Sequence, residues 1–109
     1  MIRHRVHQRL ARLRAAGEEP APCWAAFPDL PLGDLGWRMG AGEEHALLVR
    51  VWVEALSETE RLRWLCRHPP APAEWEEVAV SLLIGPEAEE APYDAAVHRL
   101  TAAGVLLPE

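Results

Sequence analysis

The N-terminal segment of the chain carries large aliphatic residues at helical spacing. They recur at every third or fourth position: Ile2, Val6, Leu10 and Leu13. At the pitch of an α-helix these side chains fall within one arc of about 80°. Gly17 follows as a stop signal, because glycine readily adopts the left-handed conformation that ends a helix. The pattern predicts an amphipathic helix over residues 2–16.

The segment EEHALLVRVWVEAL predicts a second helix, over residues 43–56. Nine of the eleven residues at positions 46–56 are apolar, and the two exceptions, Arg50 and Glu54, lie four positions apart. A helix with so narrow a polar stripe is typical of a central helix that others cover on most sides. A buried strand over residues 47–53 is the alternative, because the valine spacing alone does not exclude it.

Three further helices are predicted in the C-terminal half, over residues 57–68, 72–84 and 92–104. The first begins with the capping-box sequence SETE, in which Ser57 caps the helix and Glu60 reaches back to the backbone. Prolines and glycines mark the other boundaries. The apolar tail that follows residue 104 is expected to pack back on the core.

Residues 18–42 contain four prolines and four glycines, which exclude a long regular element. The same segment carries many large apolar or sulfur-containing residues: Cys23, Trp24, Phe27, Leu30, Leu32, Leu35, Trp37 and Met39. A solvated linker is typically polar and carries few large apolar side chains. We therefore expect an ordered loop across the core, with a short helical turn near residues 24–27 and with Trp37 and Met39 inserted into the core.

These elements together predict an all-α protein of four to five short helices, with the Pro/Gly/Trp-rich loop packed across the core. The 109 residues match the size of one domain. We divide it into a basic amphipathic helix (1–17), the ordered loop (18–42) and a helical body (43–109). No apolar run approaches the roughly 20 residues of a membrane span, and the N-terminus lacks the apolar core of a signal peptide. We therefore expect a cytoplasmic protein without a membrane partner, in which both cysteines are free thiols.

The composition is unusual in its basic and amide residues. All eleven basic residues are arginine, asparagine is absent, and only one glutamine occurs. A GC-rich coding bias favours such a composition. Growth at high temperature also favours it, since amide side chains are thermolabile. The ten prolines fit the stiffening of loops. We interpret the source as bacterial and thermophilic.

Charge is distributed unevenly along the chain. Residues 1–16 hold five arginines and no acidic residue, whereas the rest holds six arginines and seventeen acidic residues. Arginines on one helix suggest contact with phosphates, which makes a nucleic-acid accessory protein one alternative function. However, the net charge is −6 and the isoelectric point is about 5.3. Because nucleic-acid-binding domains are typically basic, we do not expect nucleic acid to be the main partner.

The stretch GWRMGAGEEH, residues 36–45, combines glycines with a following helix, as phosphate-binding loops do. The lysine and the Ser/Thr of such a loop are missing, and two glutamates in the first turn would repel a phosphate. The alternative is a groove for a partner chain, lined by Trp37, Arg38 and a glutamate. The predicted partner-binding residues are Trp37, Arg38, Glu43, Glu44, Arg5, Arg9 and Arg12.

Groups suited to catalysis or metal binding are scarce in this sequence. There are two serines and two threonines, and helix capping accounts for Ser57 and Thr59. Neither a CxxC nor an HExxH motif occurs, whereas structural zinc normally has four ligands at regular spacing. We therefore predict no catalytic residue, no metal ligand and no cofactor. A small enzyme or metal protein remains a further alternative, and it would use Cys23, Cys66, His68 and His98.

The function that we expect is a non-enzymatic one. Five tryptophans in 109 residues, an apolar helix 43–56 and a basic helix 1–17 are typical of an interaction protein. The N-terminal arginines are expected to dock on an acidic face, either of the same chain or of a second copy. The sequence thus predicts a protein–protein interaction or self-associating module, whose partner is another protein or itself.

Overall fold

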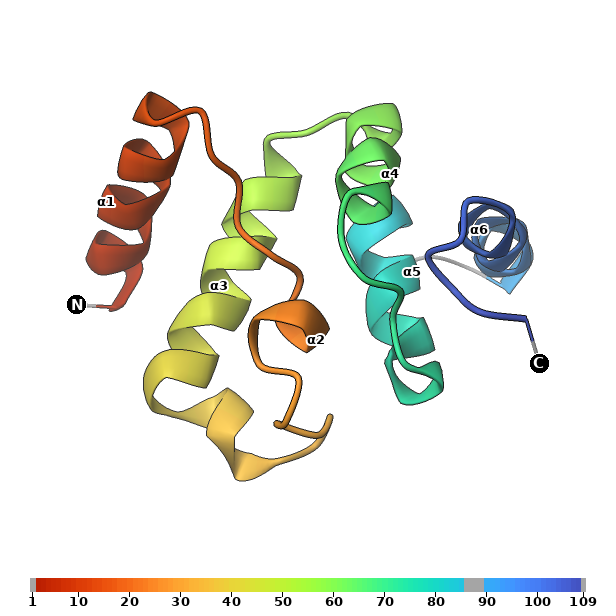
Figure 1. Cartoon of the computed structure of the whole chain (residues 1–109), viewed down its shortest axis with the longest axis horizontal. Coiled ribbons are helices and arrows are strands. Elements are labelled where there is room, and N and C mark those ends of the chain that lie inside the picture. Colours follow the sequence, from red (N-terminus) through yellow and green to blue (C-terminus); the bar gives the residue numbers. More distant parts are fainter. Residues whose placement is uncertain (1, 86–89, 109) are drawn as a thin grey trace. The chain divides into compact units, whose positions relative to one another are not determined.

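The computed structural model describes residues 2–85 and 90–108, and in these residues the chain is all-α, as the sequence predicts (Figure 1). The described part holds six α-helices and two short 3-10 helices: α1 (Ile2–Ala15), α2 (Cys23–Ala26), η1 (Leu35–Arg38), α3 (Gly40–Glu54), α4 (Glu58–Cys66), η2 (Ala73–Trp75), α5 (Glu76–Ile84) and α6 (Glu90–Ala102). They form two compact units, an N-terminal unit (Met1–Ala55) and a C-terminal unit (Leu56–Glu109).

The N-terminal unit is built on the packing of α1 against α3 (Figure 1). Val6 and Leu10 of α1 and Leu48 of α3 are completely buried and form its core cluster. The remaining apolar side chains of these two helices pack around the cluster: Ile2, Leu13, Leu47, Val51 and Trp52. All four residues of the predicted α1 arc therefore belong to this interface. The helix ends near Gly17, whose φ of +70° is left-handed, which confirms the predicted stop.

Helix α3 covers the segment for which a buried strand was the alternative, so the strand alternative is wrong. Leu48, Val49 and Val53 are buried, whereas Arg50 and Glu54 form the exposed stripe. The predicted start at residue 43 is also wrong, because α3 begins three residues earlier, at Gly40. Its first turn includes two glycines, and glycines ordinarily predict a loop.

The predicted loop 18–42 is ordered but less irregular than expected. Its helical turn exists as α2, with Trp24 buried, and it contains η1 as a further element. The expectation that Met39 fills the core is wrong, since this residue is 54% exposed. Met39 is the extended residue that joins η1 to α3, with φ −154° and ψ 157°, so it lies at the junction of the two helices and not within either of them.

The C-terminal unit surrounds a second apolar core, contributed by α4, α5, α6 and the tail. Its completely buried side chains include Trp64, Leu65, Leu83, Leu100 and Val105. The capping box of Ser57 and Glu60 is present at the start of α4, as predicted. The Ala71 N–H donates to the Val105 carbonyl oxygen over 2.8 Å, so the tail packs on the core, as the sequence predicts.

Candidate functional site

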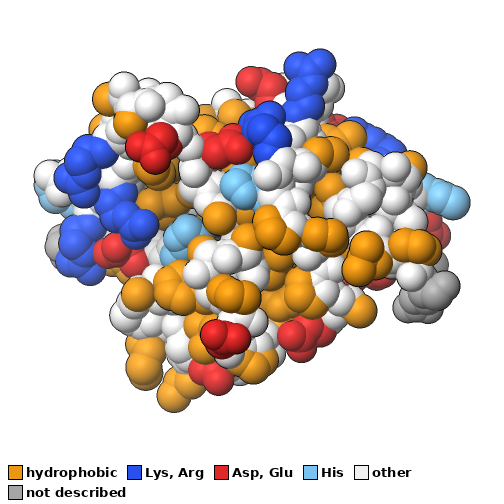
Figure 2. Space-filling view, viewed as in Figure 1, with side chains coloured by type: hydrophobic (Ala, Val, Ile, Leu, Met, Phe, Trp, Pro, Cys, Tyr) orange, Lys and Arg blue, Asp and Glu red, His pale blue; other side chains and the backbone are white. Residues whose placement is uncertain are grey.

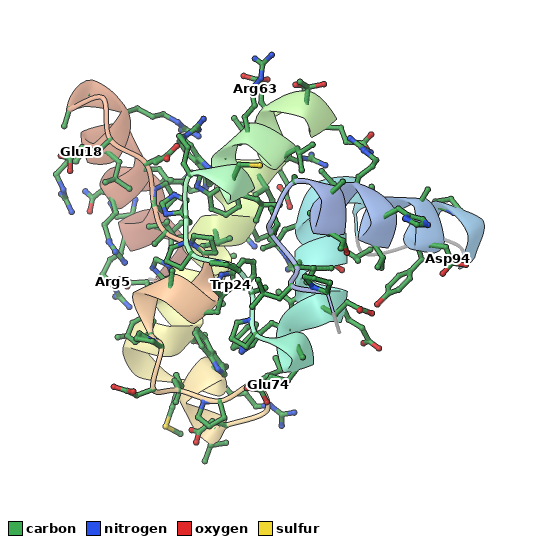
Figure 3. The ribbon with its side chains drawn as sticks, turned by 45° about the vertical axis from the view of Figure 1, so that its right-hand side comes forward. Arg5, Glu18, Trp24, Arg63, Glu74 and Asp94 are labelled. Carbon is green, nitrogen blue, oxygen red and sulfur yellow. The ribbon has the colours of Figure 1, made fainter. Side chains whose placement is uncertain are left out.

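Two arginines of α1 bind one carboxylate of α3. The Nε of Arg5 donates to Oε1 of Glu44 over 2.7 Å, and Nη1 of Arg9 donates to Oε2 over 3.0 Å. Residues four apart lie on one side of a helix, which brings both guanidinium groups to the same acid; Figure 3 shows Arg5 on α1. The Arg5 hydrogen bond, together with Arg9, lowers the pKa of Glu44 below its ordinary value. This cluster therefore joins α1 to α3 within one chain.

His45, the next residue of α3, is buried beside this cluster. Its Nε2 lies 2.8 Å from the carbonyl oxygen of Ala21, and its ring meets the Phe27 ring edge to face, with centroids 5.6 Å apart. A neutral imidazole with a proton on Nε2 donates to that oxygen. Burial lowers the pKa of His45, so the neutral form is favoured at physiological pH. The imidazole therefore acts as a structural group that ties α3 to the loop before α2.

The other arginines of α1 have different surroundings. The Arg14 guanidinium lies 5.8 Å from the centre of the Trp52 ring, a cation–π distance. Arg12, a predicted partner-binding residue, is exposed, and among residues 2–85 and 90–108 it forms no ion pair. Of the seven predicted residues, the structure thus brings together Arg5, Arg9 and Glu44.

A set of exposed hydrophobic side chains lies on and around η1. Leu32 is 41% exposed, Leu35 is 61% exposed and Met39 is 54% exposed. We call these three residues the η1 edge. In Figure 2, hydrophobic side chains project at the lower end of the view, over η1 and the start of α3. The sequence pattern did not identify these three residues as exposed, because the hydrophobicity of a loop residue does not indicate whether its side chain faces the core or the solvent.

The backbone under the η1 edge is firmly held. Asp34 caps η1, accepting from the Gly36 N–H over 2.8 Å. The indole Nε1 of Trp37 donates to the Pro31 carbonyl oxygen over 3.0 Å. A Cβ at Gly42 would overlap the carbonyl oxygen of Gly36, so η1 lies directly against the backbone of α3. The exposed side chains are therefore presented by an ordered platform.

Charged residues of both signs border the η1 edge. Asp34, Arg38 and Glu43 are all exposed, and Figure 2 shows acidic side chains beside the projecting hydrophobic ones. Neither Arg38 nor Glu43 has an ion-pair partner within the part of the chain that the structure describes. Three of the predicted partner-binding residues, Trp37, Arg38 and Glu43, thus lie on or next to this surface.

The residues that would serve an enzyme or metal protein are dispersed. Cys23 lies on α2, where burial raises the pKa of its thiol to about 11, which disfavours the nucleophilic thiolate. In the C-terminal unit, Cys66 is exposed at the end of α4, His68 packs edge to face on Trp64, and His98 is exposed on α6. Both cysteines are free, as predicted. Among the described residues, no group of three or more His, Cys, Asp or Glu side chains is placed to hold a metal ion.

Polar contacts in the C-terminal unit link its helices to one another. Arg99 of α6 forms an ion pair with Glu58 of α4. The Tyr93 hydroxyl donates to Oε2 of Glu76 over 2.8 Å, and this hydrogen bond to a carboxylate raises the pKa of Tyr93 to about 12. These pairs join neighbouring helices within the unit, which is a structural role.

Similarity to other proteins gives no indication of function. Comparisons of the chain with protein-family models, with curated proteins and with solved structures find no match. In the described ranges, no helix combines the length and the apolar character that crossing a membrane requires. The chemistry of the exposed surface is therefore the main guide to function.

Proposed function

We propose that this protein is a non-enzymatic protein-interaction module that docks through the η1 edge. The observation that carries the proposal is the exposure of Leu32, Leu35 and Met39 on an ordered turn. Large hydrophobic side chains that are exposed on one ordered segment, with charged residues beside them, are typical of interaction sites. Ordering the turn in advance also lowers the entropy that binding would cost.

The distribution of charge on α1 supports the same proposal over nucleic-acid binding. Two of its five arginines, Arg5 and Arg9, are hydrogen-bonded to Glu44 of the same chain. Phosphates would have to compete with that carboxylate for both guanidinium groups. Arg5 and Arg9 therefore serve to hold α1 on α3. The exposed apolar turn is the surface that we propose for docking.

Site-specific photo-crosslinking tests the proposal. A benzoylphenylalanine at position 35 of the full chain, in cells that produce the protein, is expected to give covalent adducts with protein of defined mass after irradiation. A matched variant carries the same group at position 107, because Leu107 is a leucine of similar exposure, 67%, in the C-terminal unit. The proposal predicts strong adducts at position 35 and weak ones at position 107.

Two results would contradict the proposal. One is an equal yield of adducts at the two positions, which indicates random collision with exposed hydrophobic groups. The other is the absence of any protein adduct at position 35. Circular dichroism of each purified variant provides the control for folding, since a local change at an exposed position should leave the helical signal unchanged.

A further inference from the structure

We infer that the occupant of the η1 edge is the η1 edge of a second copy of this chain, related to the first by a two-fold axis. This inference rests on the proposed function and names the partner of the same surface. It is carried by the pattern of apolar and charged residues on that surface, which is complementary to itself.

The apolar residues provide the centre of such an interface. In a two-fold interface the same patch is used by both copies, so residues near the axis meet their own counterparts. Apolar side chains such as those of Leu32, Leu35 and Met39 can pack against their own counterparts in the second copy. Contacts between aliphatic and thioether groups need neither an opposite charge nor a hydrogen-bond partner. A cluster of one charge in that place would repel its own copy.

The charged residues provide a rim with both signs. Arg38 lies at the end of η1, Asp34 lies before its start, and Glu43 lies in the first turn of α3. All three are exposed, and among residues 2–85 and 90–108 Arg38 forms no ion pair within the chain. A two-fold axis that passes between Arg38 and Glu43 places Arg38 of each copy against Glu43 of the other. A uniformly basic or acidic partner would satisfy only one sign of this rim.

The small extent of the edge sets the expected strength of the dimer. Stable interfaces bury about 800 Å² on each partner, and three side chains with a charged rim supply less than that. Interfaces at this lower end are weak or transient. We therefore expect monomer and dimer in exchange at micromolar or higher protein concentrations.

Sedimentation equilibrium of the full chain, from about 10 µM to about 1 mM, measures this association. The wild-type protein is expected to show a mass that rises from monomer toward dimer. Leu35→Asp is expected to remain monomeric at all concentrations, because a two-fold axis would bring two buried carboxylates together. Leu107→Asp is the matched control, which should associate as the wild type does.

A charge exchange tests the two-fold arrangement itself. Arg38→Glu leaves only acidic groups on the rim, and Glu43→Arg adds a second cation, so each variant alone is expected to dimerise at least about tenfold more weakly. In a mixture of the two variants, positions 38 and 43 are both acidic in one copy and both basic in the other. Opposite charges then face each other across the axis, so the mixture is expected to associate again. Arg63→Glu, an exposed change on α4, controls for the general effect of net charge.

The outcomes separate this inference from the proposed function. A wild-type mass that stays monomeric up to about 1 mM overturns self-association, whereas adducts at position 35 with a different protein would still support an interaction module. Dimers that Leu35→Asp leaves intact place the interface elsewhere and overturn the assignment. A mixture of the charge variants that associates no better than each alone overturns the two-fold pairing.

Discussion

At the scale of single residues, the protonation state of the His45 imidazole affects the stability of the folded chain. Its imidazole is buried on α3, with the Ala21 carbonyl oxygen of the loop before α2 as its acceptor and Arg9 as a nearby cation. Protonation would add a second N–H and a positive charge to a group already removed from water. Burial therefore lowers the pKa of His45 below its ordinary value of 6.5.

This lowered pKa predicts a loss of stability in mildly acidic solution. Below pH 6.5 the unfolded chain binds a proton at this imidazole more readily than the folded chain does, so the free energy of unfolding falls as the pH falls, until the folded pKa is reached. One proton limits the slope to about 1.4 kcal/mol per pH unit. Urea unfolding between about pH 8 and about pH 5.5 measures the loss.

A neutral amide at this position serves as the test. His45→Gln retains an N–H that can donate to Ala21 and removes the titration, so its stability should depend less on pH in this range. His98→Gln, on the exposed face of α6, is the control and should keep the wild-type dependence. Identical pH profiles for the wild type and His45→Gln would rule out this role of His45.

For the candidate site, the sequence predicted individual residues but not which of them are in contact. Arg5, Arg9 and Glu44 were all candidates, but their mutual contact joins positions 39 and 35 residues apart, and no local pattern specifies such a pairing. Met39 was assigned to the core by its hydrophobicity alone. Met39 is instead exposed at the junction between η1 and α3, and hydrophobicity alone does not indicate which way a side chain at such a junction faces.

At the scale of elements, periodic segments were predictable and glycine-rich ones were not. The spacing of aliphatic residues predicts α1 to within one residue of its observed end, since the same side chains form its contact with α3. The start of α3 was missed because Gly40 and Gly42 indicate a break. Gly42 is instead required by the close approach of η1, which no property of the isolated helix indicates.

This close approach predicts the sign of a substitution in α3. In an ordinary helix Gly42→Ala would stabilise by about 1 kcal/mol. Here the new methyl group would meet the Gly36 carbonyl oxygen, a backbone atom that cannot turn away, so we expect a net destabilisation of about 1–3 kcal/mol. Thermal unfolding measures the change, and Ala41→Ser, at an exposed position of the same turn, is the control. A more stable Gly42→Ala protein would refute the direct packing of η1 on α3.

At the scale of the whole molecule, two compact units divide a chain for which the sequence predicts one domain. Each unit has its own buried core, with Leu10 and Leu48 in the first and Trp64 and Leu83 in the second. A unit of about 55 residues buries only about 60% of its unfolded surface and is marginal by itself. Size therefore favours unfolding of the chain as one cooperative domain, which stays a prediction.

The Gly42→Ala variant decides between one cooperative domain and two, because its strain lies wholly in the N-terminal unit. If the chain unfolds in one transition, the midpoint of unfolding falls by the same amount at every residue. Urea titration followed by residue-resolved NMR measures this, with Leu48 reporting on the first core and Leu83 on the second. We expect the two midpoints to shift together. A shift confined to Leu48 would instead establish two independently folding units, and the predicted single domain would then be wrong.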